Sequence, residues 1–455
     1  MSIDISTINY PIKNNLKTII HVPANHFLLI LSESIPWEEY ALIAIEDLYK
    51  DRKKSGKKLN FRLHLGAFLL QTIFRWTDRE LEENLKYYSP ARIFCGIKNE
   101  QVSYDHSAYV KFRNRLSDET ANKFNISLLK VATKRGFTGA TFVDVDSTVQ
   151  EANIEYPADI RMMQSIFRKG VKLLNGLSEV GSSSAKNLLS SFDIKSTEKL
   201  FKSYFFAKKS NDGFELKVKV FREAHKISTK MVEAILSIQN KLKDYILPWN
   251  FKRDNEQLTG VAPILLNQIN HFIKYAEVAP NKILSLHASE VKCISKGKAG
   301  KPYEFGRKFF IGRLPGNYSF TMTDNEFALE DSNSLEKVLN NFEEIFNKSP
   351  DSISGDQAFW SRKNLKACED KKITEIGICP RGHKNWKVDE SKIEEMATRR
   401  SKVEPIIGHL KRRGMGKSKM KSDAMTRLDG QRSSLSLNLS RLARDLSDVE
   451  LKWAG

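Results

Sequence analysis

The sequence has few cysteines and no long apolar run. Its 455 residues include four cysteines at scattered positions without a CxxC pair, which excludes a disulfide framework and a zinc ribbon. The longest aliphatic or aromatic run near the N-terminus, Phe27–Leu31, is far shorter than the roughly 20 residues that span a bilayer. We therefore expect a cytoplasmic protein with reduced thiols and no membrane partner.

Acidic residues are also scarce relative to basic ones. The chain has 74 Lys and Arg against 55 Asp and Glu, a formal net charge of +19. An excess of this size favours polyanions, through counterion release and electrostatic steering. With 40% hydrophobic and 28% charged residues, the composition excludes collagen-like, coiled-coil and wholly disordered chains. Nucleic acid is therefore the leading predicted partner.

The first part of the chain has a helical pattern, from about Phe61 to Arg135. Within it, Thr77 and Glu80 have the spacing of a capping box, which predicts that a helix begins there. Short helices with interspersed cations suit a DNA-binding domain, although a plain helical bundle explains the pattern equally well. We predict that residues 1–138 form an all-helical N-terminal domain that binds DNA.

The pattern changes at Ala140 from helical to alternating. Val143 and Val145 point to one side of the predicted strand, and Asp144 and Asp146 point to the other. The sequence therefore predicts a strand that carries carboxylates along one face.

The rest of the chain predicts a mixed α/β domain that a helical segment interrupts. Residues 139–165 form its first part, residues 166–278 return to a helical pattern and are interpreted as an insertion, and residues 279–455 form the remainder. The remainder begins with strand patterns, then alternates strands and helices, and ends in a basic helix and a C-terminal helix. This order is typical of a mixed sheet with flanking helices.

Three carboxylates occupy positions that suit chemistry on nucleic acid. Asp146 lies on the first strand, Asp356 follows a predicted strand end, and Glu404 is surrounded by cations. Cutting or joining a phosphodiester calls for a few carboxylates that hold divalent cations. Asp144 shares a face with Asp146 and is the alternative candidate on that strand.

Four blocks of sequence, taken in order, carry a specific resemblance. They are Asp146–Asp159, Ser285–Lys308, Gly355–Asn364 and Val403–Lys411. In these blocks the chain resembles the DDE transposases of bacterial insertion sequences, in the insertion-sequence-five-like group. Residues Phe61–Leu116 also resemble the helical N-terminal domain of that group. The resemblance implies an α/β catalytic domain built on a ribonuclease-H-like mixed sheet with flanking helices.

The resemblance also implies a set of site residues. Asp146, Asp356 and Glu404 match the three acidic residues that act in catalysis and bind two Mg²⁺ ions, for which Mn²⁺ is a substitute. An Arg four residues before the Glu and a Lys seven after it are further family features, and both are present. With the basic residues that follow, the predicted DNA-binding cations are Arg400, Lys411, Arg412 and Arg413. Nine cations lie between Arg399 and Lys421, against the single acid Glu404.

The implied function is metal-dependent cleavage of DNA at terminal inverted repeats and strand transfer into target DNA. A homodimer on paired ends, in the bacterial nucleoid, is expected by resemblance. The alternatives are a catalytically silent, transposase-derived DNA-binding protein, a nuclease relative that does not join DNA, and a generic RNA-binding protein.

Three positions bear on these alternatives. The tyrosine that the family has seven residues before the Glu is Ala397 here, and Gln357 and Ala358 replace the Arg and Gly that commonly follow the second Asp. These departures are compatible with the silent alternative. Pro405 directly follows Glu404, which predicts a kink or a helix start at that proline.

Overall fold

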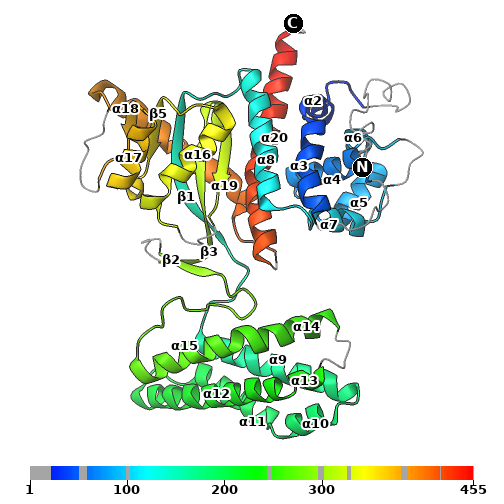
Figure 1. Cartoon of the computed structure of the whole chain (residues 1–455), viewed down its shortest axis with the longest axis vertical. Coiled ribbons are helices and arrows are strands. Elements are labelled where there is room, and N and C mark those ends of the chain that lie inside the picture. Colours follow the sequence, from blue (N-terminus) through cyan, green and yellow to red (C-terminus); the bar gives the residue numbers. More distant parts are fainter. Residues whose placement is uncertain are drawn as a thin grey trace. The chain divides into compact units, whose positions relative to one another are not determined.

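The computed structural model describes residues 22–50, 59–98, 103–242, 248–295, 302–324, 329–380, 388–420 and 422–453. The chain forms two compact units, of which the first combines Met1–Asn153 with Gly306–Gly455 and the second is Ile154–Phe305. The second unit thus contains residues 166–278 and extends beyond them at both ends (Figure 1). No helix in the described ranges combines the length and the apolar character that a membrane span needs.

The first unit begins with short helices. They are α2 (Phe27–Ser34), α3 (Trp37–Tyr49), α4 (Phe61–Phe74), α5 (Asp78–Tyr87), α6 (Ser89–Phe94), α7 (His106–Arg113) and α8 (Asp118–Lys134). The predicted capping box starts α5: the Glu80 backbone N–H donates to the Thr77 hydroxyl, and the Glu80 carboxylate accepts from the Thr77 backbone N–H. The predicted helical N-terminal region is therefore confirmed.

The same unit contains five strands of a mixed sheet. They are β1 (Phe142–Glu151), β3 (Tyr303–Arg313), β4 (Ser319–Met322), β5 (Ser352–Gly355) and β6 (Glu375–Gly377). With β2 (Lys292–Ser295) the sheet has six strands in the order β2-β3-β1-β5-β6, and β4 pairs with β3 off this path. Strand β3 is antiparallel to both β1 and β4, whereas β1, β5 and β6 are parallel. Helices flank this sheet, so the predicted α/β fold class is confirmed and is consistent with a ribonuclease-H-like core.

One face of the sheet packs on the main hydrophobic core. Val143 and Val145 of β1 are buried there, together with Val338 and Phe342 of α16 (Leu335–Phe346). Helix α17 connects β5 to β6 and spans Arg362–Asp370.

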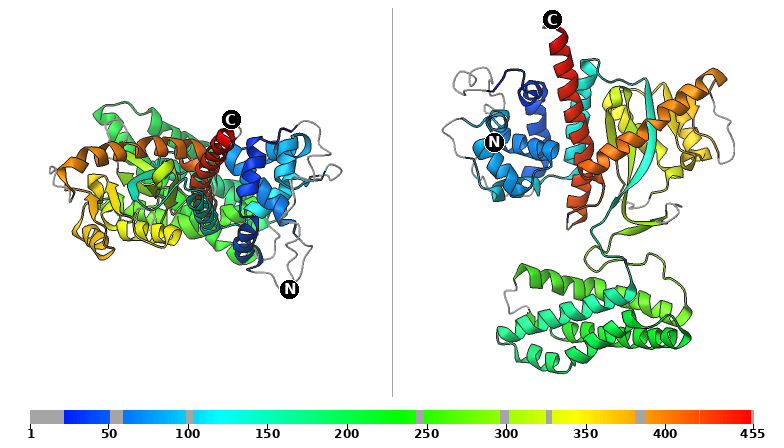
Figure 2. Two further views of the ribbon diagram at one scale, coloured as in Figure 1. Left: turned by 90° about the horizontal axis from the view of Figure 1, so that it is seen from above. Right: turned by 180° about the vertical axis from the view of Figure 1, so that it is seen from behind.

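The opposite face of the sheet carries the carboxylates. It is covered by α18 (Glu390–Ser401) and α19 (Val403–Leu410), which lie over β1 in the rear view of Figure 2. Buried Phe309 and Ile311 of β3 pack there against Ile406 and Leu410 of α19. The alternation seen in the sequence of β1 therefore separates an apolar core face from a face enclosed by helices.

A long C-terminal helix, α20 (Asp423–Trp453), packs beside α8 (Figure 1). Leu435, Leu439 and Leu442, which have helical spacing in the sequence, are fully buried. The helix also makes buried polar contacts, because the Asn438 amide donates to the Asn125 side-chain oxygen at 2.7 Å. Helix α20 thus joins the N-terminal helices to the sheet within one unit.

Most of the described residues of the second unit are helical. Its helices are α9 (Asp159–Glu179), α10 (Ser183–Ser190), α11 (Ile194–Phe206), α12 (Asn211–Ser237), α13 (Gln239–Leu242), α14 (Trp249–Glu256) and α15 (Ala262–Tyr275). They enclose an apolar core of their own, which includes Phe167, Phe201, Met231 and Leu265. Strand β2 (Lys292–Ser295) follows, and β3 is next to it in the strand order.

Candidate active site

Asp146 lies on β1, and Asp356 directly follows the end of the neighbouring parallel strand β5. The last pair in the register of β1 with β5 is Val145 with Gly355, and each aspartate follows directly. Paired strands are about 4.8 Å apart, so the two carboxylates belong to one edge of the β1–β5 pair. Asp146 is half-buried, and the Asp356 side chain is 55% exposed.

A glycine permits this close approach of the two strands. A Cβ atom at Gly355 would lie 2.8 Å from Cγ2 of Val145, closer than carbon atoms normally pack. We expect Gly355→Ala to displace the end of β5 and to lower the free energy of unfolding by about 1–3 kcal/mol, as overpacking does. Urea unfolding measures this change. Gly139→Ala is the matched control, because no heavy atom lies within 4 Å of its added Cβ; equal losses in both variants would contradict the close contact.

Glu404 lies at the start of a helix. Helix α18 ends at Ser401 and α19 begins at Val403, so the helix start is two residues before the proline. Pro405 consequently occupies the first turn of α19, where backbone N–H groups lack intrahelical partners. The proline is therefore compatible with this helix, and Glu404 gains the favourable interaction of a carboxylate with a helix N-terminus.

A cavity of about 280 Å³ brings the predicted site residues together. It is lined by Asp146, Ala397, Arg400, Ser401 and Glu404. Arg400 also reaches the remaining carboxylate, since its Nη1 lies 4.0 Å from Oδ1 of Asp356. The first and third acidic residues of the motif thus share one cavity, and the second contacts a residue of its wall.

The spacing of these carboxylates is wider than that of a single-ion site. Among the described residues, the three ligand atoms found within 4.8 Å of one another belong to Glu82, Asp105 and His106. That cluster, which the sequence analysis did not single out, links two helices: the His106 ring contacts Glu82 at 2.9 Å, and Asp105 caps α7. A hydrogen bond from Lys86, and to a smaller extent those from His106, keep the pKa of Glu82 below its usual range.

Asp144 has a different environment from Asp146. Its side chain is fully buried; one carboxylate oxygen lies 2.5 Å from Nη1 of Arg313, and the other accepts from Nε of Arg399 at 2.8 Å and from the Ser354 hydroxyl at 2.7 Å. This arrangement is a buried ion-pair network in which Asp144 is the carboxylate partner of two guanidinium groups. Arg399, counted by sequence among the cations around Glu404, points into this network.

The comparison with protein families concerns the helices that precede the sheet. Residues 17–115 match the family described as Transposase domain (DUF772). The N-terminal region of this chain is therefore similar to a transposase domain. The comparisons with curated proteins and with solved structures each found no match.

The basic segment Arg399–Lys421 begins beside the candidate site and lies far along the chain from the matched residues 17–115. Lys411 and Arg412 are exposed on the π-helical turn Lys411–Met415. Arg413 is half-buried, donates to the Ser436 hydroxyl at 2.9 Å, and has its pKa lowered by burial. Of the four predicted DNA-binding cations, Lys411 and Arg412 are therefore the most accessible.

Proposed function

We propose that this protein is an insertion-sequence transposase of the DDE type. It would cleave DNA at terminal inverted repeats and transfer the cut strand into target DNA, as a homodimer on paired ends. The observation that carries the proposal is the shared cavity of Asp146 and Glu404, with Asp356 in contact with Arg400 of its wall. It is supported by a ribonuclease-H-like sheet and by the similarity of the preceding helices to a transposase domain.

The side chains around this cavity fit divalent metal ions. Carboxylate oxygens are the ligands that Mg²⁺ takes in proteins, and none of the three proposed ligands is buried as Asp144 is. Asp146, Asp356 and Glu404 would hold two Mg²⁺ ions, or Mn²⁺ as a substitute. Such ions activate the attacking oxygen and neutralise charge on the phosphate and the leaving oxygen.

The surrounding cations would position the DNA. Arg400, whose side chain is 41% exposed, lies among the carboxylates and can donate to phosphate oxygens. Lys411 and Arg412 extend the positive surface about two helical turns beyond Glu404. Phosphate contacts of this kind fix the register of the DNA without reading its sequence. By resemblance, the N-terminal helices would recognise the sequence of the terminal repeats.

The test is cleavage of labelled DNA that carries the element's own inverted repeats. With Mg²⁺ or Mn²⁺ we expect nicking at the repeat boundary, followed by joining to a target duplex, and neither reaction in EDTA. Salt-sensitive binding of the ends without cutting would instead support the silent DNA-binding protein. Cutting without preference for the ends, and without joining, would support the nuclease relative.

A further inference from the structure

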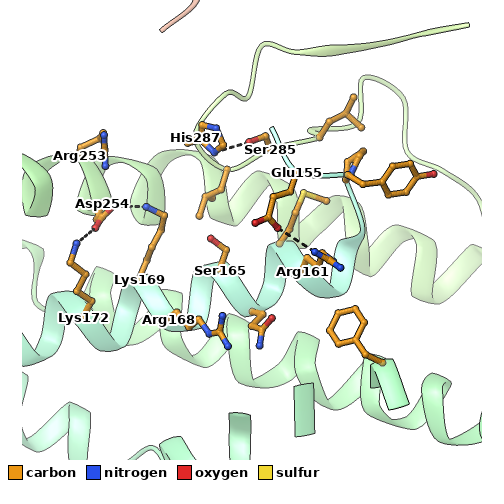
Figure 3. A pocket seen from close by; sticks show the side chains of 17 residues that line it. Glu155, Arg161, Ser165, Arg168, Lys169, Lys172, Arg253, Asp254, Ser285 and His287 are labelled. Carbon is orange, nitrogen blue, oxygen red and sulfur yellow. Dashed lines mark hydrogen bonds and ion pairs between the residues drawn. The ribbon is translucent and has the colours of Figure 1, made fainter. Parts of the chain in front are cut away.

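A second cavity, of about 670 Å³, lies entirely within the helical unit Ile154–Phe305 (Figure 3). We call it the α9 cavity, because α9 supplies much of its wall. Its charged lining residues are Arg161, Arg168, Lys169, Lys172 and Arg253 against Glu155 and Asp254. The excess of cations over carboxylates predicts an anionic ligand.

The cations on α9 form a row along one side of the helix. Arg161, Arg168 and Lys172 are spaced by seven and four residues, which is the repeat of one helical face, and Figure 3 shows them along the same helix. At a rise of 1.5 Å per residue the row is roughly 16 Å long. A row of this length can contact several successive phosphates of one nucleic-acid strand.

The carboxylates of the cavity neutralise only part of this charge. Lys169 and Lys172 share one partner, Asp254. Arg161 lies 3.5 Å from Glu155, and both side chains are more than half exposed, so this pair is weak. The Nε of Arg253 is buried without a hydrogen-bond partner in the described part of the chain. Arg168 donates from Nε and from Nη2 to the Glu198 carboxylate, at 2.7 Å each, and is therefore already paired with a residue outside the cavity lining. An anionic ligand would find Arg161, Lys172 and Arg253 without a full carboxylate partner of their own.

Aromatic and apolar side chains share the cavity with these cations. Phe205 is 45% exposed and Tyr156 is 73% exposed, and the Arg161 guanidinium lies 5.4 Å from the centre of the Phe205 ring. Cations that follow a backbone, next to aromatic rings on which bases can stack, are the features of proteins that bind single strands. The convex surface of a duplex cannot enter a cavity of this size, whereas one unpaired strand can.

We propose that the α9 cavity binds a segment of single-stranded DNA. Arg161 and Lys172 contact its phosphates, and Phe205 and Tyr156 contact a base. That the nucleic acid is DNA rests on the proposed function. The cavity then gives the helical unit a role of its own, which is to hold an unpaired strand.

The experiment measures binding of the full chain to labelled oligothymidine and to a duplex of equal length, in EDTA, by fluorescence anisotropy at several salt concentrations. The double variant Arg161→Gln with Lys172→Gln should bind the single strand roughly 10- to 30-fold more weakly at about 0.1 M salt. The slope of the logarithm of the binding constant against the logarithm of the salt concentration should become shallower by about 1.4, at about 0.7 for each lost phosphate contact. Glu155→Gln should strengthen binding. Phe205→Ala should weaken single-strand binding at least about fivefold and leave duplex binding unchanged.

The matched control is Lys219→Gln with Arg222→Gln, which removes one Lys and one Arg from exposed positions of α12 in the same unit. Equal losses in this control and in the Arg161/Lys172 variant, or equal losses for the duplex and the single strand, would overturn the proposal. Because no metal is present, the result does not depend on cleavage. Failure of the wild type to cut DNA would remove the proposed function and leave a positive binding result standing.

Discussion

Replacing Asp146 or Asp356 by Asn, or Glu404 by Gln, should abolish metal-dependent cutting at the inverted repeats and leave binding of the DNA ends nearly unchanged. Each amide keeps the shape of the side chain and removes a charged oxygen ligand. Metal ions supply several kcal/mol of transition-state stabilisation, and each 1.4 kcal/mol corresponds to about a factor of ten in rate. We therefore expect the nicking rate with Mg²⁺ to fall roughly a thousandfold or more in each variant.

Glu394→Gln is the control for these variants, because Glu394 is an exposed carboxylate of α18 that does not line the cavity. It should cut at the wild-type rate. A variant among the three that also kept this rate would not be a metal ligand. If end binding fell in parallel with cutting, the residue would position DNA instead.

The sequence predicted which side of β1 each residue faces, but not what covers that side. Alternation of Val143 and Val145 with Asp144 and Asp146 indicates a half-buried strand. In the structure the polar side is also enclosed, because α18 and α19 come from far along the chain and pack over it. A pattern within ten residues carries no information about such distant helices, so the burial of Asp144 could not be predicted.

The candidate site was predictable as a set of residues and not as a geometry. A motif resemblance selects Asp146, Asp356 and Glu404, yet their meeting depends on the β1–β5 register and on the helix start at Val403. The proline allowed a kink or a new helix, and the sequence alone did not decide between them. The cavity between Glu404 and Asp146 became visible only in the folded chain.

The sequence likewise did not predict how the N-terminal helices contact the sheet. Leucine spacing predicted the C-terminal helix, but the partners of that helix are chosen by buried polar contacts such as Asn125 with Asn438, and Arg75 with Asp429 at 2.6 Å. These pairs join residues that are far apart in the chain. Helical periodicity identifies the buried stripe and leaves open what it packs against.

Asp144→Asn should cost about 3–5 kcal/mol of unfolding free energy, whereas Asp146→Asn, two residues away on the same face, should cost less than about 1 kcal/mol. The side chains of Arg313 and Arg399 are 6% and 12% exposed. Removing the Asp144 charge leaves both guanidinium groups without their carboxylate partner. Removing one partner of a buried ion pair has a cost of this size.

Urea unfolding of the unit that contains β1 measures the difference between the two variants. Ser354→Ala provides an intermediate point, because it removes one hydrogen bond to Asp144 and leaves the ion pairs, for an expected loss of about 1 kcal/mol. Equal stability of the Asp144 and Asp146 variants would show that the two arginines do not depend on Asp144. Asp146→Asn should therefore abolish cutting and leave the protein stable, whereas Asp144→Asn should mainly lower the unfolding free energy.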